Sequence, residues 1–329
     1  MEAHMVGFSL PRITILARNP FRKPARELED LTFLLATRGL KFDNWAEAHT
    51  HLEHIGYYRF TGYLRPFKIG GTGSDAENFK PGTSFELVHD QYIFDRKLRI
   101  LILEAVEKIE IAARAAISDS VACRHGPHWY MDRNLFARPN YYHQRGRFDV
   151  MDWHANFIDD VKRQIGHGDP QRRDKFISHY YDTYDHPDMP PCWMVFEVIT
   201  FGSISQCLKF LKSPECGSVC KKFGLNHQII SSWLHAISYV RNLCAHHSRL
   251  WNRALTIKPT ISNAHRAAFG NCNDRIYAVL LTMQILLSRI WSNNEWAERL
   301  RDLIHAHPAI PIKMMGFPLN WEGLKEWSL

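Results

Sequence analysis

The stretch that decides the fold is TSFELVHDQYIFDRKLRILILEAVEKIEIAARAAISDSVACRHGP, residues 83–127. Its first four residues form a capping-box pattern, which is typical of the start of a helix. No glycine or proline follows until Gly126 and Pro127, which together form a stop signal. Apolar side chains recur at three- and four-residue steps, at Leu98, Leu101, Ile102, Ala105, Ile109, Ala112, Ala113 and Ala116. The stretch therefore predicts one long helix with a single core-facing side.

The rest of the chain also shows helical periodicity and no convincing strand alternation. On the N-terminal side, helix signals predict elements from Pro24 to Gly39, from a cap at Asp43 to His54, and over residues 55–67. On the C-terminal side, we predict helices at about 148–165, 193–212, 226–248, 273–292 and 294–306. The predicted fold is all-α, with an N-terminal arm and helical subdomain over 1–82 and a helical core over 83–329. The boundary falls in a loop rich in glycine and polar residues, 69–82.

Composition narrows the class of protein. The 329 residues carry 41 Lys and Arg against 34 Asp and Glu, a net charge of +7, which favours a polyanionic partner such as nucleic acid. Seven cysteines without a dense framework suit a reducing cytoplasm. The N-terminus lacks the apolar core of a secretory signal, and the longest apolar run, 276–287, is too short to span a bilayer. We therefore expect a cytoplasmic protein without a membrane partner, in which that run is a buried helix.

Residues that can carry chemistry gather in RNLCAHHSRLWNR, residues 241–253, at the end of an apolar-periodic helix. A packed helix would hold these side chains rigidly at the edge of solvent. Asn242 and His246 are four residues apart and share a face. Arg241 and His246 are five apart, roughly 140° around an ideal helix. They can serve one substrate if the last turn unwinds, if the arginine reaches round, or if the motif faces a second copy of itself.

Arg241 and His246 match the R-x4-H motif of HEPN ribonucleases. The longer run resembles the bacterial abortive-infection (Abi) proteins of the AbiD/AbiF-like group, a HEPN branch, as do residues 55–67 and 104–132. The resemblance spans roughly residues 24–251. It implies a HEPN-type helical bundle and a metal-independent endoribonuclease of antiphage defence. In that reaction the RNA 2′-hydroxyl attacks its own phosphate and leaves a cyclic phosphate and a 5′-hydroxyl.

On this resemblance the candidate catalytic residues are Arg241, Asn242 and His246. His246 would act as general acid or base, because an imidazole titrates near neutral pH. Arg241 would stabilise negative charge on a phosphorane, and Asn242 would orient either one. His247 competes with His246 for the acid–base role. Alternatively, Arg241 and His246 merely satisfy a helix C-terminus, where cations are favoured.

One motif per chain suggests a composite site built by a homodimer or higher homo-oligomer. The alternative is a degenerate second copy within the long helix, with Glu107, Glu110 and Arg114 as supporting contacts to the motif. Those three side chains could instead pair with one another along the helix.

Further residues are candidates for RNA contacts through phosphate binding and base stacking: Tyr57, Arg59, Arg65, Arg249, Trp251 and Arg253. Trp251 could equally be a core anchor, and half of the rings over 57–65 must face inward at helical spacing. No metal or cofactor is expected. Cys216, Cys220 and His227 lack a fourth zinc ligand at usual spacing, and the two cysteines are interpreted as buried thiols.

The expected function is therefore a HEPN-type endoribonuclease in abortive infection. Its expected partners are an RNA substrate and a structured small noncoding RNA, since some relatives are held by such an RNA in toxin–antitoxin pairs. Two alternatives stay open. One is a non-catalytic RNA-binding or scaffold protein with the same helices, and the other is a DNA-directed nuclease or regulator.

Overall fold

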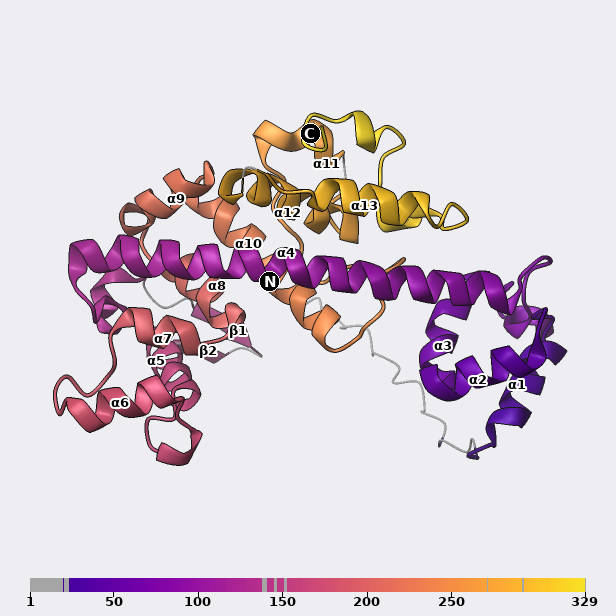
Figure 1. The fold of residues 1–329 in the computed structure, drawn as a ribbon, viewed down its shortest axis with the longest axis horizontal. Coiled ribbons are helices and arrows are strands. Elements are labelled where there is room, and N and C mark those ends of the chain that lie inside the picture. The colour runs from indigo at the N-terminus through magenta and orange to yellow at the C-terminus, as the bar shows by residue number, and fades with distance from the viewer. Residues whose placement is uncertain are drawn as a thin grey trace, which may run out of the picture.

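The computed structural model describes residues 20, 24–137, 141–144, 147–150, 153–270, 272–291 and 293–328. Its organising element is the 41-residue helix α4, Phe85–His125, which runs along the whole length of the molecule (Figure 1). Ser84 caps this helix by accepting the Leu87 N–H at 3.2 Å. The helix ends at Gly126, whose φ of 84° suits a glycine. The predicted long helix is confirmed.

Three short helices pack under the N-terminal end of α4: α1, Leu28–Thr37; α2, Trp45–Ile55; and α3, Tyr57–Leu64. Two 3-10 turns follow, η1 at Arg65–Phe67 and η2 at Ser74–Glu77. The predicted cap of α2 was wrong, because Asn44 and not Asp43 accepts the Glu47 N–H. The helices share a small apolar cluster with the first turns of α4, formed by Leu35, Leu40, Ala48, Leu52, Phe60, Tyr63, Leu64, Phe79, Phe85 and Val88. The domain boundary near residue 82 stays a prediction.

A second lobe hangs from the other end of α4 (Figure 1). It contains turns η3 (Trp129–Met131), η4 (Arg133–Leu135) and η5 (Pro170–Arg172), and helices α5 (Trp153–Gln164), α6 (Lys175–Thr183), α7 (Cys192–Val198) and α8 (Phe201–Phe210). An antiparallel hairpin joins β1, Tyr141–Gln144, to β2, Arg147–Val150. The helix predicted from residue 148 therefore starts too early. The helix predicted over 193–212 is two helices, because Thr200 caps a new one by accepting the Ser203 N–H.

The main core lies between α4 and the C-terminal half of the chain. This half contains turns η6 (Ser213–Cys216), η7 (Asn263–His265), η8 (Ile312–Met315) and η9 (Trp321–Gly323), and helices α9 (Gly217–Phe223), α10 (His227–Ala245), α11 (Arg266–Phe269), α12 (Ile276–Ile290) and α13 (Trp296–His305). Helix α10 packs against α4, α8 and α12. All of residues 276–287 are buried, as predicted. The all-α fold is confirmed, and the hairpin is the only sheet among the described residues.

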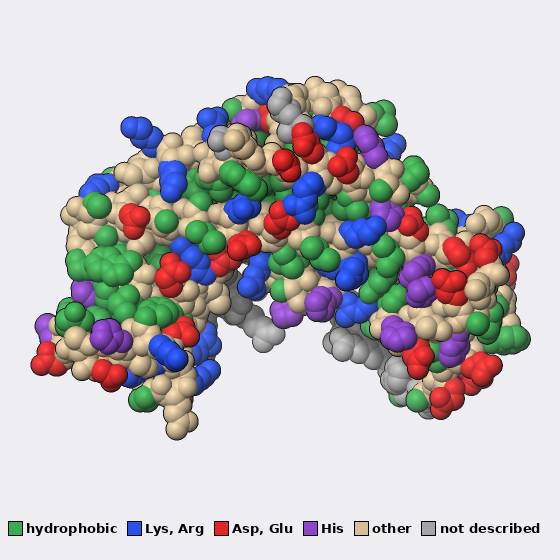
Figure 2. Space-filling model, viewed as in Figure 1, with side chains coloured by type: hydrophobic (Ala, Val, Ile, Leu, Met, Phe, Trp, Pro, Cys, Tyr) green, Lys and Arg blue, Asp and Glu red, His purple; other side chains and the backbone are tan. Residues whose placement is uncertain are grey.

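The two lobes flank a hollow on one side of α4. Figure 1 places the C-terminal end of α10 between the lobes, beneath the middle of α4. Figure 2 shows histidine, lysine and arginine side chains on the surface between the two lobes, beneath the middle of α4. The fold therefore presents the end of α10 at the centre of a concave face.

Candidate active site

The candidate catalytic side chains lie where α10 gives way to a loop. Asn242 lies in the last turn of the helix, Arg241 directly precedes it, and His246 is the C-cap. Arg241, Asn242, His246 and His247 are all exposed. The Asn242 carbonyl oxygen accepts the His246 N–H at 3.0 Å, and its side-chain oxygen accepts from the Arg241 guanidinium at 3.3 Å. The Asn242 side chain thus contacts Arg241, whereas its bond to His246 is between backbone atoms, and its orienting role stays a prediction.

The loop after the helix has an unusual backbone. His247 and Asn252 adopt φ values of 53° and 51°, and among the described residues they are the only non-glycine positions in the left-handed region. Such conformations cost free energy and persist where the surrounding structure fixes them. The segment 247–252, here called the motif loop, therefore needs strong contacts to hold its shape.

Asp95 on α4 supplies the strongest of these contacts. Its carboxylate is fully buried and accepts the backbone N–H groups of Leu250, at 3.2 Å, and Trp251, at 2.8 Å. The same carboxylate accepts from the Tyr63 hydroxyl at 2.7 Å and the Arg99 guanidinium at 2.5 Å. Hydrogen bonds to a buried charge are stronger than neutral ones, so one carboxylate ties the motif loop to both α3 and α4.

Two arginines donate hydrogen bonds to backbone carbonyl oxygens of the motif loop. Arg59 on α3 donates to the His247 carbonyl oxygen at 2.6 Å, and Arg99 reaches the Ser248 carbonyl oxygen at 3.5 Å. On the far side, Arg275 donates to the Asn252 side chain at 3.3 Å. The N-terminal helices are therefore part of the scaffold that fixes the histidines.

Burial changes the acid–base properties of this network. Burial and the Asp95 charge raise the pKa of Tyr63, which keeps its proton as a donor to Asp95. Burial opposes the charge on Arg99, but Asp95 and Tyr63 outweigh it and raise its pKa. Burial raises the pKa of the neighbouring Cys244 thiol to about 12. The groups beneath the motif loop thus form a fixed ion pair beside a protonated thiol.

The structure separates the candidate RNA contacts into buried and exposed groups. Trp251 is fully buried and stacks on Phe67 at 6.5 Å, which fits the alternative role as a core anchor. Arg249 donates to the Trp251 carbonyl oxygen at 2.7 Å, and Arg253 donates to that of Arg249 at 3.4 Å. These three side chains shape the loop.

On α3 and η1, Arg59 and Arg65 are exposed. Tyr57 is half-buried, and burial raises its pKa. Tyr58 faces solvent, whereas Tyr63 binds Asp95. The expectation that about half of these rings face inward is met.

The three supporting candidates on α4 have contacts of their own. Arg114 pairs with Glu110 and donates to the carbonyl oxygen of Phe196 at the end of α7. Glu107 is exposed. Glu110 follows Asp95 by fifteen residues, roughly 22 Å along a helix, so this pair braces α7 at a distance from the motif loop.

Sequence reasoning missed Asp95 and Arg99. Their signal lay in the helical periodicity itself, because residues 95, 98, 99, 102 and 105 recur at the core-facing spacing. An aspartate and an arginine four residues apart on an apolar face point to a buried ion pair with a further partner.

No group of three or more His, Cys, Asp or Glu side chains among the described residues is arranged to hold a metal ion. Cys216 is buried, which raises its pKa to about 12. The His227 ring contacts the Leu208 carbonyl oxygen at 2.7 Å and the Ser213 hydroxyl at 3.1 Å. None of the described helices combines the length and the apolarity needed to cross a bilayer.

Comparison with known proteins identifies the family of the chain. A family model described as Abi-like protein matches residues 50–252, well over half of the chain, and this match includes α4, α10 and nearly all of the 241–253 motif. Searches of curated proteins and of solved structures returned no match. The match suggests a part in abortive infection, a form of defence. The chain belongs to the Abi-like protein family.

Proposed function

We propose that the chain is a metal-independent endoribonuclease in which Arg241 and His246 act on the scissile phosphate of RNA. The observation that carries the proposal is the pair of exposed groups at the end of α10, next to a loop fixed by Asp95, Arg59 and Arg99. Functional side chains mounted on a rigid, hydrogen-bonded support are pre-organised for catalysis.

The chemistry follows from the side chains. Neutral His246 takes the proton of the ribose 2′-hydroxyl, and the oxygen attacks the adjacent phosphorus. The P–O5′ bond breaks, the 5′ oxygen takes up the proton that His246 has received, and the products carry a 2′,3′-cyclic phosphate and a 5′-hydroxyl. Arg241 donates to the phosphoryl oxygens as negative charge grows there. The hollow around α10, with its basic groups, is the proposed path of the RNA strand.

The test compares four proteins on a labelled RNA and on its 2′-deoxy analogue: wild type, Arg241→Ala, His246→Ala and His247→Ala. We expect the wild type to cut RNA in the presence of a chelator and to leave the deoxy analogue intact. Arg241→Ala and His246→Ala should bind the RNA normally and cut it at least about 100-fold more slowly, the scale of a general acid–base contribution. His247→Ala is the matched control at the next position.

Two outcomes would oppose the proposal. Equal RNA binding with no cleavage by any of the four proteins would favour the RNA-binding scaffold. Cleavage of the deoxy analogue would favour a DNA-directed enzyme. If His247→Ala is inactive and His246→Ala is active, the acid–base role moves to His247.

We also propose that two copies of the chain build the site, and that RNA is bound both as substrate and as a small noncoding regulator. Co-expression of Arg241→Ala with His246→Ala tests the first part. If each site takes its arginine from one chain and its histidine from the other, mixed dimers regain one intact site, and about a quarter of the wild-type activity returns. No recovery would show that each chain supplies a complete pair.

Sequencing of RNA that co-purifies with Arg241→Ala tests for the regulator.

A further inference from the structure

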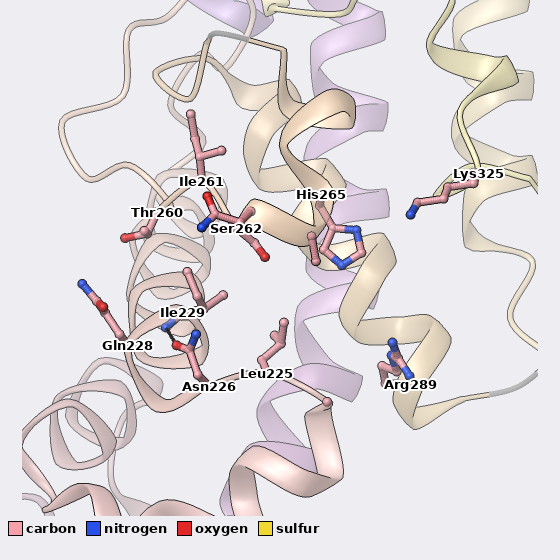
Figure 3. Close-up of a pocket in the computed structure, with 13 residues that line it drawn as sticks. Leu225, Asn226, Gln228, Ile229, Thr260, Ile261, Ser262, His265, Arg289 and Lys325 are labelled. Atoms are coloured by element: carbon pink, nitrogen blue, oxygen red, sulfur yellow. Dashed lines mark hydrogen bonds between the residues drawn. The ribbon is translucent and has the colours of Figure 1, made fainter.

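A polar cavity lies at the opposite end of α10 from the motif loop. It has a volume of about 610 Å³, which is within the range of small-molecule sites, and Figure 3 shows the side chains that surround it. Helix α10 has nineteen residues, so the cavity is roughly 28 Å from the motif loop. It is therefore a separate site from the candidate active site.

Cationic groups from distant parts of the chain meet at this cavity. Arg289 comes from the last turn of α12 and Lys325 from the C-terminal segment, and Figure 3 shows both on the side of the cavity where His265 lies. The Arg289 guanidinium is seated against Gly224, where an added Cβ would lie 3.3 Å from its central carbon. The nearby carboxylate is Glu326, which lies 2.8 Å from His265 and 3.9 Å from Lys325 and is almost fully buried. Glu326 pairs with His265 and Lys325 but not with Arg289, for which no ion pair is found among the described residues.

The N-terminus of α10 lines the same cavity through Asn226, Gln228 and Ile229. The Asn226 side chain caps α10 by accepting the Ile229 N–H at 2.9 Å. Among the described residues, the N–H groups of His227 and Gln228 have no acceptor. Free N–H groups at a helix N-terminus favour anions, and phosphate most of all when cations are near.

An independent observation points to a ligand. Gln284 is a polar residue in the middle of the apolar helix α12, and it is only 4% exposed. Its side-chain oxygen is buried and has no partner among the described residues. It borders an adjoining cavity of about 440 Å³ that shares His265, Arg289 and Lys325 with the first. A buried carbonyl oxygen without a hydrogen-bond donor is unfavourable, and a donor group of a bound ligand would satisfy it.

We infer that this pair of cavities binds a phosphomonoester of nucleotide size. Arg289 and Lys325 hold the phosphate, and the N-terminus of α10, which lines the other side of the first cavity, favours its negative charge. The Gln284 amide, which both donates and accepts, meets a hydroxyl or base edge of the same ligand. The inference does not depend on the nuclease proposal, because it concerns other residues and is tested by binding alone.

The experiment is calorimetric titration of the full chain with inorganic phosphate, with AMP and with GMP. The variants are Arg289→Gln, Lys325→Gln and Gln284→Leu. Arg172→Gln is the matched control, because it removes one exposed positive charge on η5 in the other lobe. Thermal unfolding of each variant confirms that it folds.

We expect saturable binding of a nucleotide by the wild type and by Arg172→Gln. Arg289→Gln and Lys325→Gln should each weaken it about tenfold or more, since each removes a charge-assisted hydrogen bond. Gln284→Leu should weaken nucleotide binding but not phosphate binding, and it should raise the melting temperature of the free protein.

Three results would overturn the inference. They are absence of binding by the wild type at millimolar ligand, equal binding by the wild type and both charge variants, and binding of inorganic phosphate with no preference for either nucleotide.

Discussion

Replacing Asp95 with asparagine is expected to be among the most damaging single-atom changes in the described chain. The side chain keeps its shape, but it loses its charge and gains an N–H group where only acceptors fit. The carboxylate currently serves the Tyr63 hydroxyl, the Arg99 guanidinium and the amides of Leu250 and Trp251. In Asp95→Asn the Arg99 cation stays buried without its counter-ion.

The size of the loss follows from that burial. Both side chains of the ion pair are nearly inaccessible to solvent, at 0% for Asp95 and 6% for Arg99. Removing one partner of such a pair costs about 3–5 kcal/mol, because the other charge remains desolvated. We expect Asp95→Asn to lower the free energy of unfolding by an amount in this range. In a protein with ordinary marginal stability, that is a large share of the total.

Urea denaturation monitored by circular dichroism measures this change. Asp119→Asn is the matched control, because Asp119 is exposed on the same helix, and it should shift the free energy of unfolding by less than about 0.5 kcal/mol. The double variant Asp95→Asn with Arg99→Met removes the stranded charge and should lose less than the sum of the two single variants. The proposed RNA cleavage should also slow in Asp95→Asn under conditions where the variant is fully folded, because the motif loop loses the carboxylate that binds its backbone.

A loss below about 1 kcal/mol for Asp95→Asn, or strict additivity with Arg99→Met, would refute this reasoning. Either result would mean that the carboxylate is not the main support of the motif loop.

Three further predictions concern stability. Burial and the stacked ring of His51, whose centroid is 4.0 Å away, lower the pKa of His89 in the folded protein. The unfolded chain therefore binds more protons at acid pH, so the free energy of unfolding should be full above pH about 6.5 and fall below it. In urea denaturation midpoints measured from pH 8 to 5, His89→Gln should flatten this fall. Trp251→Ala should cost about 3–5 kcal/mol in the same assay, because it empties a core position, and a near-neutral effect would argue against the core-anchor role. Gly316→Ala should destabilise by more than about 1 kcal/mol, because its φ is 92° and the new Cβ would lie 2.7 Å from that of Arg275; a change within error in thermal unfolding would contradict this.

The sequence predicted much of the fold because its strongest signals are local. The periodicity of α4 and α10 and the stop at Gly126 are properties of short segments, and the structure reproduces them. The hairpin at 141–150 was missed because its strands are four residues each and pair only with one another. The split at Thr200 was missed because a threonine within an apolar run reads equally as a helix interior or as a cap.

The site was harder to predict because its support is non-local. The motif at 241–253 is visible as a run of residue types, but the carboxylate that holds it lies about 150 residues earlier in the chain. Likewise, no spacing rule connects Arg59 with the His247 carbonyl oxygen, 188 positions away. Trp251 and Arg249 have the composition of an RNA-binding surface, and only the packing shows that they serve the loop.

The most direct measurement is the chemical identity of the ends left on RNA cut by the purified wild-type protein, with His246→Ala as the comparison. A 2′-hydroxyl mechanism at Arg241 and His246 predicts a 2′,3′-cyclic phosphate and a 5′-hydroxyl on the fragments, with both products lost in His246→Ala. Fragments with a 3′-hydroxyl and a 5′-phosphate, or unchanged cutting by His246→Ala, would contradict it.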